Sequence, residues 1–174
     1  PVGLALSRNR SIIDCNQRLC DMFGTSRERL VGQSFQILYP SADEFERAGV
    51  RITPILNRKG TYADDRLMRR VDGRFKDEVF WCHVTGRALN RDAPHEAGIW
   101  CFEDLSAMRP VTADLTARER EVAAHLMQGM TSKQIGKTLD ISHRTVEIYR
   151  ARLMRKYKAA NAGDLIHNMM AGAH

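Results

Sequence analysis

The sequence predicts an α+β domain followed by an all-α domain. Residues 1–110 mix short strand-like runs with helical spacing, whereas residues 115–174 show only helical spacing with repeated helix-start signals. In the first segment the helices form one block within a series of strands, an order that favours an antiparallel sheet with helices on one face. We therefore expect an α+β domain over residues 1–105, a linker over 106–114 and a domain of four helices over 115–174.

The chain opens with a predicted β-hairpin. Two short apolar runs, residues 3–7 and 11–15, are separated by three polar residues. Helical spacing follows over residues 16–23, and Gly24 stands where that helix would end. A second short helix is expected over residues 26–31.

Strand-like composition returns from residue 61. Residues 61–70 form one candidate strand, and a turn around Asp72 and Gly73 separates it from a second candidate over 75–89. After a polar loop, residues 98–105 form the last candidate strand. The first domain should therefore contain five strands.

Composition and charge narrow the possible classes of protein. With 27 lysines and arginines against 21 aspartates and glutamates, the chain carries a net charge of +6, which suggests a polyanionic partner. Basic side chains concentrate in residues 144–158, where Glu147 is the one acidic residue. No run approaches the roughly 18 to 20 apolar residues of a membrane-spanning helix, so we expect a cytoplasmic protein with no membrane partner.

The sequence contains no metal-binding or catalytic motif. The four cysteines, Cys15, Cys20, Cys82 and Cys101, have no CxxC spacing, and the six histidines form no paired metal pattern. We therefore expect reduced thiols and no metal site. Because GxSxG, P-loop and supported Cys-His motifs are also missing, we expect that the chain is not an enzyme.

Helix-start signals recur in the second segment. Thr116 with Glu119, and Thr131 with Gln134, match the capping box, in which two side chains satisfy free backbone N–H groups of the first turn. Ser142, and Asn161 with Asp164, supply two further starts. The predicted helices span residues 117–128, 132–139, 143–158 and 162–170.

The second and third of these helices form a predicted helix-turn-helix around the tight turn at Asp140-Ile141-Ser142. At about 100° per residue, the third helix has a buried side that carries Val146, Tyr149, Leu153 and Tyr157. Its opposite side mixes charged with small or apolar side chains suited to base edges in the major groove: Arg144, Glu147, Ile148, Ala151 and Arg155. Basic residues on its flanks, placed for phosphates, are Arg150, Arg152 and Lys156.

The helical segment as a whole resembles the LuxR-type (GerE) DNA-binding domain. The matching residues are 115–122, 129, 132–135, 139, 141–142, 145–147 and 154–157. The Thr-Val-Glu version is most similar to the subset attached to FixJ-type response regulators, while Tyr149 and Gly136 depart from the histidine and alanine usual in the family. The resemblance implies DNA contacts from Lys133, Arg144, Thr145, Glu147, Ile148 and Ala151, to which the helical wheel adds Arg150, Arg152 and Arg155.

Glu147 needs its own explanation, because DNA phosphates repel a carboxylate. Its side chain either accepts a hydrogen bond from a cytosine amino group or orients Arg144 or Arg150, three residues away on either side. The sequence leaves both roles open.

The first domain resembles a PAS domain in the order and spacing of its motifs, which are residues 8–10, 15–18, 23–26, 30–32 and 100–106. This resemblance implies a sensor or dimerisation domain. No histidine precedes His83 and the photosensor motif Asn-Cys-Arg-x-Leu-Gln is missing, so we expect neither haem nor flavin. The interior is either filled by its own side chains or open to a small apolar ligand, and its expected lining is Leu6, Ile13, Met22, Phe23, Leu38, Phe80, Trp81 and Trp100.

The two resemblances together predict a sequence-specific bacterial transcription regulator whose PAS domain controls its DNA-binding domain. We expect no cofactor, and the expected partners are double-stranded DNA, a second copy of the chain and RNA polymerase. No receiver domain with an acidic cluster is recognisable, which disfavours control by phosphorylation. The alternative is a PAS-based interaction module that is tethered to DNA without ligand control.

Overall fold

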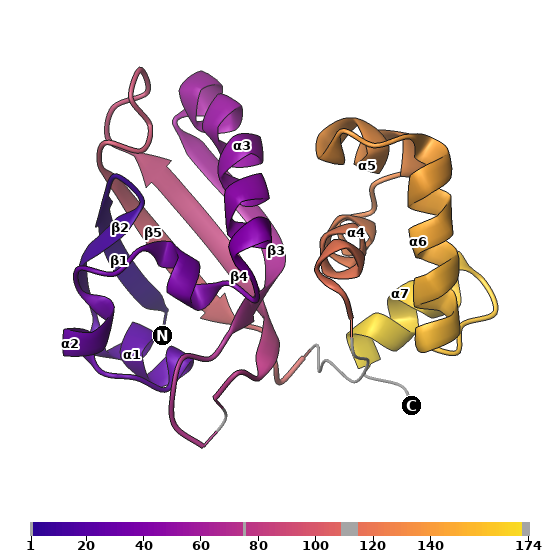
Figure 1. Cartoon of the computed structure of the whole chain (residues 1–174), viewed down its shortest axis with the longest axis horizontal. Coiled ribbons are helices and arrows are strands. Elements are labelled where there is room, and N and C mark those ends of the chain that lie inside the picture. Colours follow the sequence, from indigo (N-terminus) through magenta and orange to yellow (C-terminus); the bar gives the residue numbers. More distant parts are fainter. Residues whose placement is uncertain (1, 75, 109–114, 172–174) are drawn as a thin grey trace. The chain divides into compact units, whose positions relative to one another are not determined.

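The computed structural model describes residues 2–74, 76–108 and 115–171. The chain forms two compact units, Pro1–Asp104 and Leu105–His174 (Figure 1). Of the predicted linker 106–114, residues 109–114 lie outside the described residues.

The first unit is built on an antiparallel sheet. The strands follow the order β2-β1-β5-β4-β3, and every neighbouring pair is antiparallel. The chain leaves the β1–β2 hairpin, passes through a block of helices and returns as β3 to β5, so β5 lies beside β1. The predicted α+β class and five strands are confirmed. The strands are β1 (Gly3–Arg8), β2 (Ser11–Cys15), β3 (Thr61–Arg69), β4 (Val79–Ala88) and β5 (Gly98–Asp104).

The helices of the first unit start and stop at recognisable caps. In α1, the Asn16 side chain accepts a hydrogen bond from the Leu19 N–H at 3.0 Å, and Gly24 ends the helix in the left-handed conformation with φ of 69°. Glycine adopts that conformation without steric cost, which is why the predicted stop at Gly24 is confirmed. The helices are α1 (Gln17–Phe23), α2 (Arg27–Leu30), the 3-10 helix η1 (Phe35–Leu38) and α3 (Ala42–Lys59).

The long helix α3 is absent from the sequence-based prediction. Its start carries a readable signal, because the Ser41 hydroxyl accepts from the Glu44 N–H at 3.2 Å. Pro54 argues against a helix in the sequence, because proline removes a helical hydrogen bond. In the structure both Pro54 and Val50, whose carbonyl loses that bond, lie on the exposed side of α3, where water can replace the missing donor.

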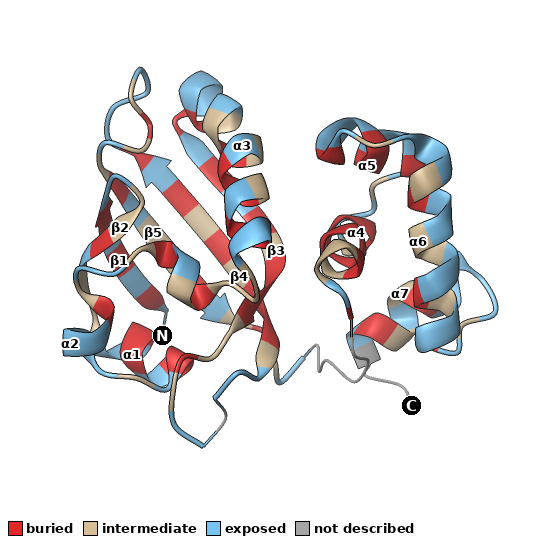
Figure 2. Ribbon diagram, in the orientation of Figure 1, coloured by how far each residue is buried: buried red, intermediate tan, exposed pale blue. Residues whose placement is uncertain are grey.

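The core of the first unit lies between the helices and one face of the sheet. The Phe23 ring packs edge-on against Phe80 at 5.4 Å and against Phe102 at 5.9 Å between ring centroids. Met22 and Leu38, both predicted to face the interior, belong to the same buried cluster. Figure 2 shows the alternation of buried and exposed positions along the strands that separates this inner face from the outer one.

Two residues assigned to the interior from the sequence are exposed, and a third, Trp81, is fully buried but on the other face of the sheet. The prediction is wrong for Leu6 and Ile13, which are 43% and 42% exposed, because the inward positions of β1 and β2 belong to their neighbours Ala5 and Ile12. Trp81 follows Phe80 on β4 and therefore faces the opposite side of the sheet, outside the inner cluster.

The predicted strand 75–89 also begins later, at Val79. Before it, Gly73 and Asp77 adopt positive φ angles of 78° and 64°, and residue 75 lies outside the described residues. Backbone in that conformation cannot continue a strand, so the turn is longer than the Asp-Gly pair suggested.

The second unit is a bundle of four helices whose starts match the prediction. Thr116 with Glu119, and Thr131 with Gln134, form complete capping boxes. Helix α6 ends two residues before the predicted position 158, where Lys158 has a φ of 52°. The helices are α4 (Ala117–Met127), α5 (Ser132–Leu139), α6 (His143–Lys156) and α7 (Ala162–Ala171).

Candidate nucleic-acid interface

Helices α5 and α6 form a helix-turn-helix that is closed by short backbone contacts. Asp140 ends α5 in the left-handed conformation, with φ of 53°, and the Ile141 N–H donates to the Gly136 carbonyl at 2.9 Å. The Ser142 hydroxyl then caps α6 by accepting from the Thr145 N–H at 3.0 Å. A Cβ atom at Gly136 would lie 2.7 Å from the Ile141 carbonyl oxygen, so this glycine lets the turn approach α5 closely.

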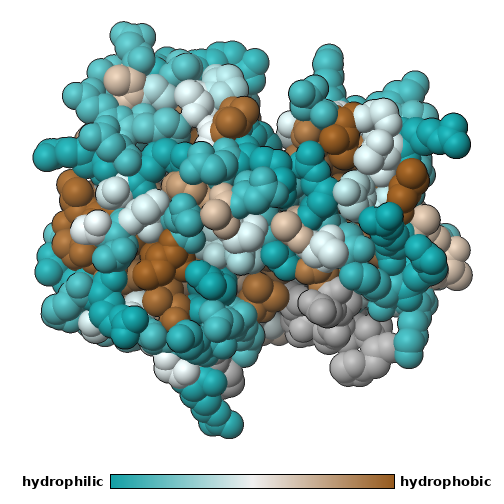
Figure 3. All heavy atoms as spheres, viewed as in Figure 1, coloured by the Kyte–Doolittle hydropathy of each residue, from teal (hydrophilic) through white to brown (hydrophobic). Residues whose placement is uncertain are grey.

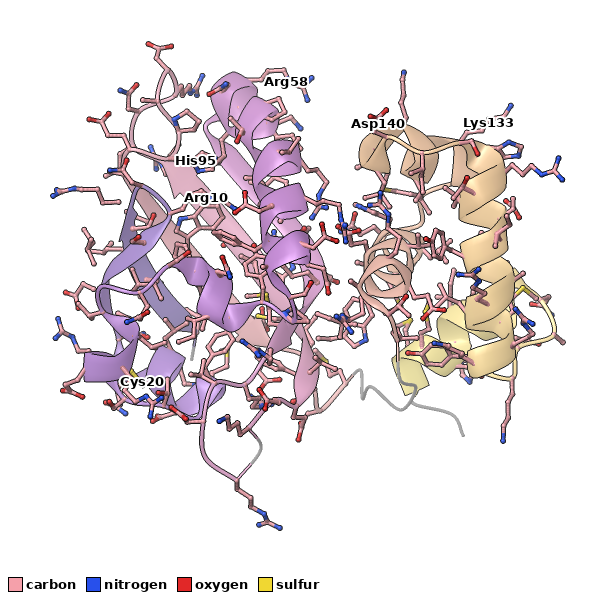
Figure 4. The ribbon with its side chains drawn as sticks, viewed as in Figure 1. Arg10, Cys20, Arg58, His95, Lys133 and Asp140 are labelled. Atoms are coloured by element: carbon pink, nitrogen blue, oxygen red, sulfur yellow. The ribbon has the colours of Figure 1, made fainter. Side chains whose placement is uncertain are left out.

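The structure places the predicted DNA-binding residues along one accessible surface of this motif. Thr145 and Arg150 are half-buried, and Ile148 is 48% exposed although it is apolar. Figure 4 labels Lys133, on the outside of α5 near the start of α6, and in Figure 3 most of the surface in view over the second unit is hydrophilic or neutral. The exposed members of the predicted set are Lys133, Arg144, Glu147, Ile148, Ala151, Arg152 and Arg155.

A hydrogen-bond network connects the two helices at the centre of this surface. The Ser132 hydroxyl, at the first position of α5, donates to Glu147 Oε1. Arg150 Nη1 donates to the same carboxylate oxygen at 3.2 Å and to the Ser132 oxygen at 2.7 Å. Ser132 is buried, and no pattern in the sequence singles it out as part of the interface.

This network bears on the two roles that the sequence left open for Glu147, which are accepting a hydrogen bond from a base and orienting an arginine. Its Oε1 atom holds Arg150, whereas its Oε2 atom makes no hydrogen bond to the residues that the structure describes. The hydrogen bond from Ser132 lowers the pKa of Glu147 most strongly; burial opposes it, but with the charge of Arg150 the pKa stays below its usual value. Glu147 is therefore ionised at neutral pH, orients Arg150, and keeps one oxygen for another donor.

Two further basic residues of α6 have partners within the second unit. Lys156 was expected beside DNA phosphates, but its Nζ atom donates to Glu119 Oε2 of α4 at 2.7 Å. Arg152 lies over the ring of Tyr149, with 5.4 Å between the guanidinium carbon and the ring centroid. Tyr149 was predicted to lie on the buried side of this helix, but it is only half-buried and not part of the core, so that prediction was wrong. Its ring holds the Arg152 side chain along the helix.

We expect the Lys156–Glu119 pair to stabilise the second unit against acid. Burial raises the pKa of Glu119, but hydrogen bonds from Lys156 and from the Thr116 N–H outweigh it and hold the pKa below the ordinary value of 4.5. The stabilisation is complete above the unfolded pKa and is lost as the pH falls through the lower folded value. Carbon-13 NMR titration should show a higher Glu119 pKa in Lys156→Gln and no change in Lys158→Gln. An equal Glu119 pKa in the parent and Lys156→Gln would contradict this assignment.

Other kinds of site find little support in the described part of the chain. Within residues 2–74, 76–108 and 115–171, no group of three or more His, Cys, Asp or Glu side chains could hold a metal ion. Burial raises the pKa of the Cys82 thiol to about 12, so it stays protonated at neutral pH. None of the helices that the structure describes is long and apolar enough to cross a membrane.

These features define a two-domain regulator, with an α+β unit of the sensor type ahead of a helix-turn-helix unit. Family models match both parts: a PAS domain over residues 1–107, and bacterial regulatory proteins of the luxR family over residues 113–169. The chain belongs to these families as a LuxR-type regulator with a PAS sensory domain.

Individual relatives agree with this assignment. The chain is 39% identical over 102 residues to the transcriptional regulatory protein FixJ of Rhizobium meliloti, a match that covers 56% of this chain and 48% of FixJ. The PAS domain of a LuxR-family transcriptional regulator from Burkholderia thailandensis, solved in complex with ethanol, is 58% identical with a TM-score of 0.57, covering 61% of this chain and 90% of that domain. The chain spans between about a quarter and a half of the length of the curated relatives it matches.

Solved structures also match the chain over both units. VqmA of Vibrio cholerae, solved as a dimer without target DNA, is 21% identical with a TM-score of 0.54, and the match covers 96% of this chain and 81% of VqmA. At this identity the similarity shows the fold alone.

Proposed function

We propose that this chain is a sequence-specific bacterial transcription regulator whose helix α6 reads base edges in the major groove. The observation that carries the proposal is the surface of α6, where Glu147 and Arg150 are held in place by Ser132 beside an exposed Ile148. Fixed polar side chains beside an apolar one suit base readout better than a merely solvated helix face. We propose a sensor over residues 1–105, a linker over 106–114 and an effector over 115–174, acting in the cytoplasm, where the DNA is.

Each predicted DNA contact has a separate role in this proposal. Glu147, Ile148 and Ala151 face bases, and Arg150 is aimed by Glu147. The N-terminus of a helix attracts anions, which places Lys133 and the start of α5 beside a phosphate. Arg144 and Arg155 lie on the same side as the three residues that face bases, while Thr145 and Arg152 on the flanks hold the DNA backbone.

Salt dependence tests the phosphate contacts. We expect the affinity of the full chain for duplex DNA to fall steeply with salt, because each neutralised phosphate releases counterions and adds about 0.9 to the log-log slope. Lys133→Ala should reduce the slope by about one such unit, measured by fluorescence anisotropy on random-sequence DNA. Lys59→Ala, which removes an exposed lysine of the first unit, should leave the slope unchanged. Salt-independent binding would exclude the proposed interface.

We also propose that the chain acts as a homodimer. The outer face of the sheet carries an exposed apolar strip, in which Leu4, Leu6, Ile13 and Ile99 are 38–43% exposed. In the register of β1 and β5, Leu6 lies opposite Ile99, so the strip is continuous across the strands. Such a strip favours pairing between copies of the chain.

The dimer makes a measurable prediction. Leu6→Glu places a charge in the apolar strip and should halve the mass of the full chain in light scattering. Val50→Glu, at an apolar residue of α3 that is 78% exposed and outside the strip, should not. A dimer should also protect two half-sites about 10 base pairs apart, centre to centre. A parent chain that is monomeric and protects one half-site would contradict the proposal.

The PAS unit is proposed to sense a small molecule. Support comes from the ethanol complex of the 58% identical PAS domain and from a cavity of about 40 Å³ in this unit. Trp100 is the one predicted lining residue that borders this cavity, whereas Met22, Phe23, Leu38 and Phe80 pack in the core. The alternative, an interaction module tethered to DNA, predicts that no ligand changes transcription of a reporter gene. RNA polymerase is the proposed partner on the DNA, and no catalytic role is proposed.

A further inference from the structure

The cavity of the PAS unit combines an aromatic wall with two arginines. It lies between the inner face of the sheet, η1 and α3, and its volume is about 40 Å³. Trp100 and Phe35 pack edge-on in its wall, 5.9 Å apart between centroids, while Arg10 and Arg66 supply charge. Since a single water needs roughly 10–15 Å³ of such space, the cavity has room for about three to four water-sized groups and suits a small molecule.

Two glycines make room for the side chains that shape the cavity. A Cβ atom at Gly49 of α3 would lie 2.6 Å from Arg10 Nη2, and one at Gly86 would lie 2.3 Å from the Trp100 ring. Arg10 therefore lies flat against α3, with its guanidinium carbon 3.7 Å from the Phe45 ring centroid. Figure 4 labels Arg10, on the strand side of α3, with His95 nearby.

Arg66 is buried in the cavity wall with incomplete hydrogen bonding. It is 6% exposed, and its Nε atom donates to Asp64 Oδ1 at 2.6 Å. Its Nη1 atom donates to the Tyr39 hydroxyl at 2.5 Å. Although Nη2 is 2.5 Å from the Asp64 carboxylate, it makes no hydrogen bond to the described residues. Nη2 is thus paired by charge with Asp64 but lacks an aligned acceptor for its N–H groups, which is costly in a buried position, so the site favours an added acceptor.

The charges around the cavity are positive in sum. Asp64, which balances Arg66, is shared with Arg51, whose Nη2 atom lies 3.4 Å from its second oxygen. The counter-charge of Arg10 is Glu46, which is 66% exposed and 3.4 Å away, so water screens that pair. Among the residues that the structure describes, two arginines therefore border the cavity and no acidic side chain does.

His95 also lines the cavity, as a polar side chain without charge. The Thr53 hydroxyl donates to the Gly49 carbonyl at 2.7 Å, so its oxygen accepts from His95 Nε2, which is also 2.7 Å away. The Nδ1 atom is then the acceptor nitrogen of a neutral ring. Burial, and next the charge of Arg10, lower the pKa of His95. His95 thus leaves the charge of the site to the arginines.

We propose that this cavity binds a short-chain monocarboxylate anion, with its carboxylate on Arg66 and Arg10 and its alkyl end against Trp100 and Phe35. This inference rests on the proposed sensory role of the PAS unit and specifies its ligand class. An inorganic anion would leave the aromatic wall uncovered, and an alcohol would leave the arginine charge unmatched. A short-chain carboxylate satisfies both ends.

The test uses propionate and its neutral isostere propionamide with the full chain. Both tryptophans of the chain, Trp81 and Trp100, lie in the first unit, so tryptophan fluorescence reports on that unit alone. At equal ionic strength, set with sodium chloride, propionate should raise the Tm of this unit and bind at least about tenfold more tightly than propionamide. Equal binding of the two, or no binding of propionate, would overturn the proposal.

Variants locate the binding. Arg10→Gln should weaken propionate binding about tenfold, whereas Arg58→Gln, at an exposed residue of α3 labelled in Figure 4, should not. Arg66→Gln leaves Asp64 paired with Arg51, so no buried charge is left alone, and this variant should also lose the preference for propionate over propionamide. A retained preference in both variants would place the binding elsewhere. DNA binding, measured on the same samples, separates failure of this inference from failure of the proposed regulator.

Discussion

Asp64→Ala is expected to lower the free energy of unfolding of the PAS unit by about 3–5 kcal/mol. Burial opposes the ionisation of Asp64, but the charges of Arg66 and Arg51, with a hydrogen bond from Tyr62, hold its pKa below the usual value. Its removal leaves the Arg66 guanidinium, 7% exposed, without a counter-charge. Urea unfolding followed by tryptophan fluorescence measures the effect on this unit.

A surface ion pair provides the matched control. Asp43 pairs with Arg47 one turn along α3, and its side chain is 66% exposed. Asp43→Ala should cost less than about 1 kcal/mol, since solvent screens such pairs and the first-turn position adds only a modest helix-dipole effect. Similar losses in the two variants would show that the buried charges of the PAS unit are not coupled as described.

Glu147→Ala should reduce the preference for the selected DNA site over random DNA by about 1–3 kcal/mol. The variant frees Arg150 from its fixed direction and removes the open Oε2 acceptor, so both proposed roles are lost together. Affinity for random DNA should stay equal or rise, because a negative charge beside the phosphates is gone. Fluorescence anisotropy on the two DNAs gives the specificity ratio directly.

Two further variants separate the roles of Glu147. Ser132→Ala removes the bond that holds Glu147 and Arg150 to α5, and should show a smaller loss of specificity with no change in the charge of the surface. Glu147→Gln keeps an oxygen that can accept from Arg150, so recovery of specificity would assign the effect to positioning. An unchanged specificity ratio in Glu147→Ala would mean that the residue has no part in readout.

The second unit was more predictable from sequence because its signals are local. Capping residues such as Thr116 and Thr131 act within one helical turn, and the structure starts each predicted helix at the expected residue. The contact of Glu147 with Ser132 joins residues 15 positions apart, and depends on how α5 meets α6. Nothing in the local pattern specifies that distance.

The PAS unit was less predictable because its faces depend on strand register. Along β1 buried and exposed positions alternate strictly, with Ala5 inward and Leu6 outward, and Ile13 likewise lies outward beside the inward Ile12; their apolar character alone does not reveal the side they face. The cavity residues Arg10 and Arg66 were missed for a related reason. Arginine is seldom buried, and only the tertiary pairing with Asp64 and the space at Gly49 accommodate the two side chains.

Dimethyl sulfate interference on the selected DNA site tests whether α6 reads the major groove. The reagent methylates guanine N7 in the major groove and adenine N3 in the minor groove. If α6 reads base edges as described, methylation of guanine N7 within each half-site should block binding of the full chain, while methylation of adenine N3 there should not. Interference by adenine N3 alone, or by neither position, would contradict the account.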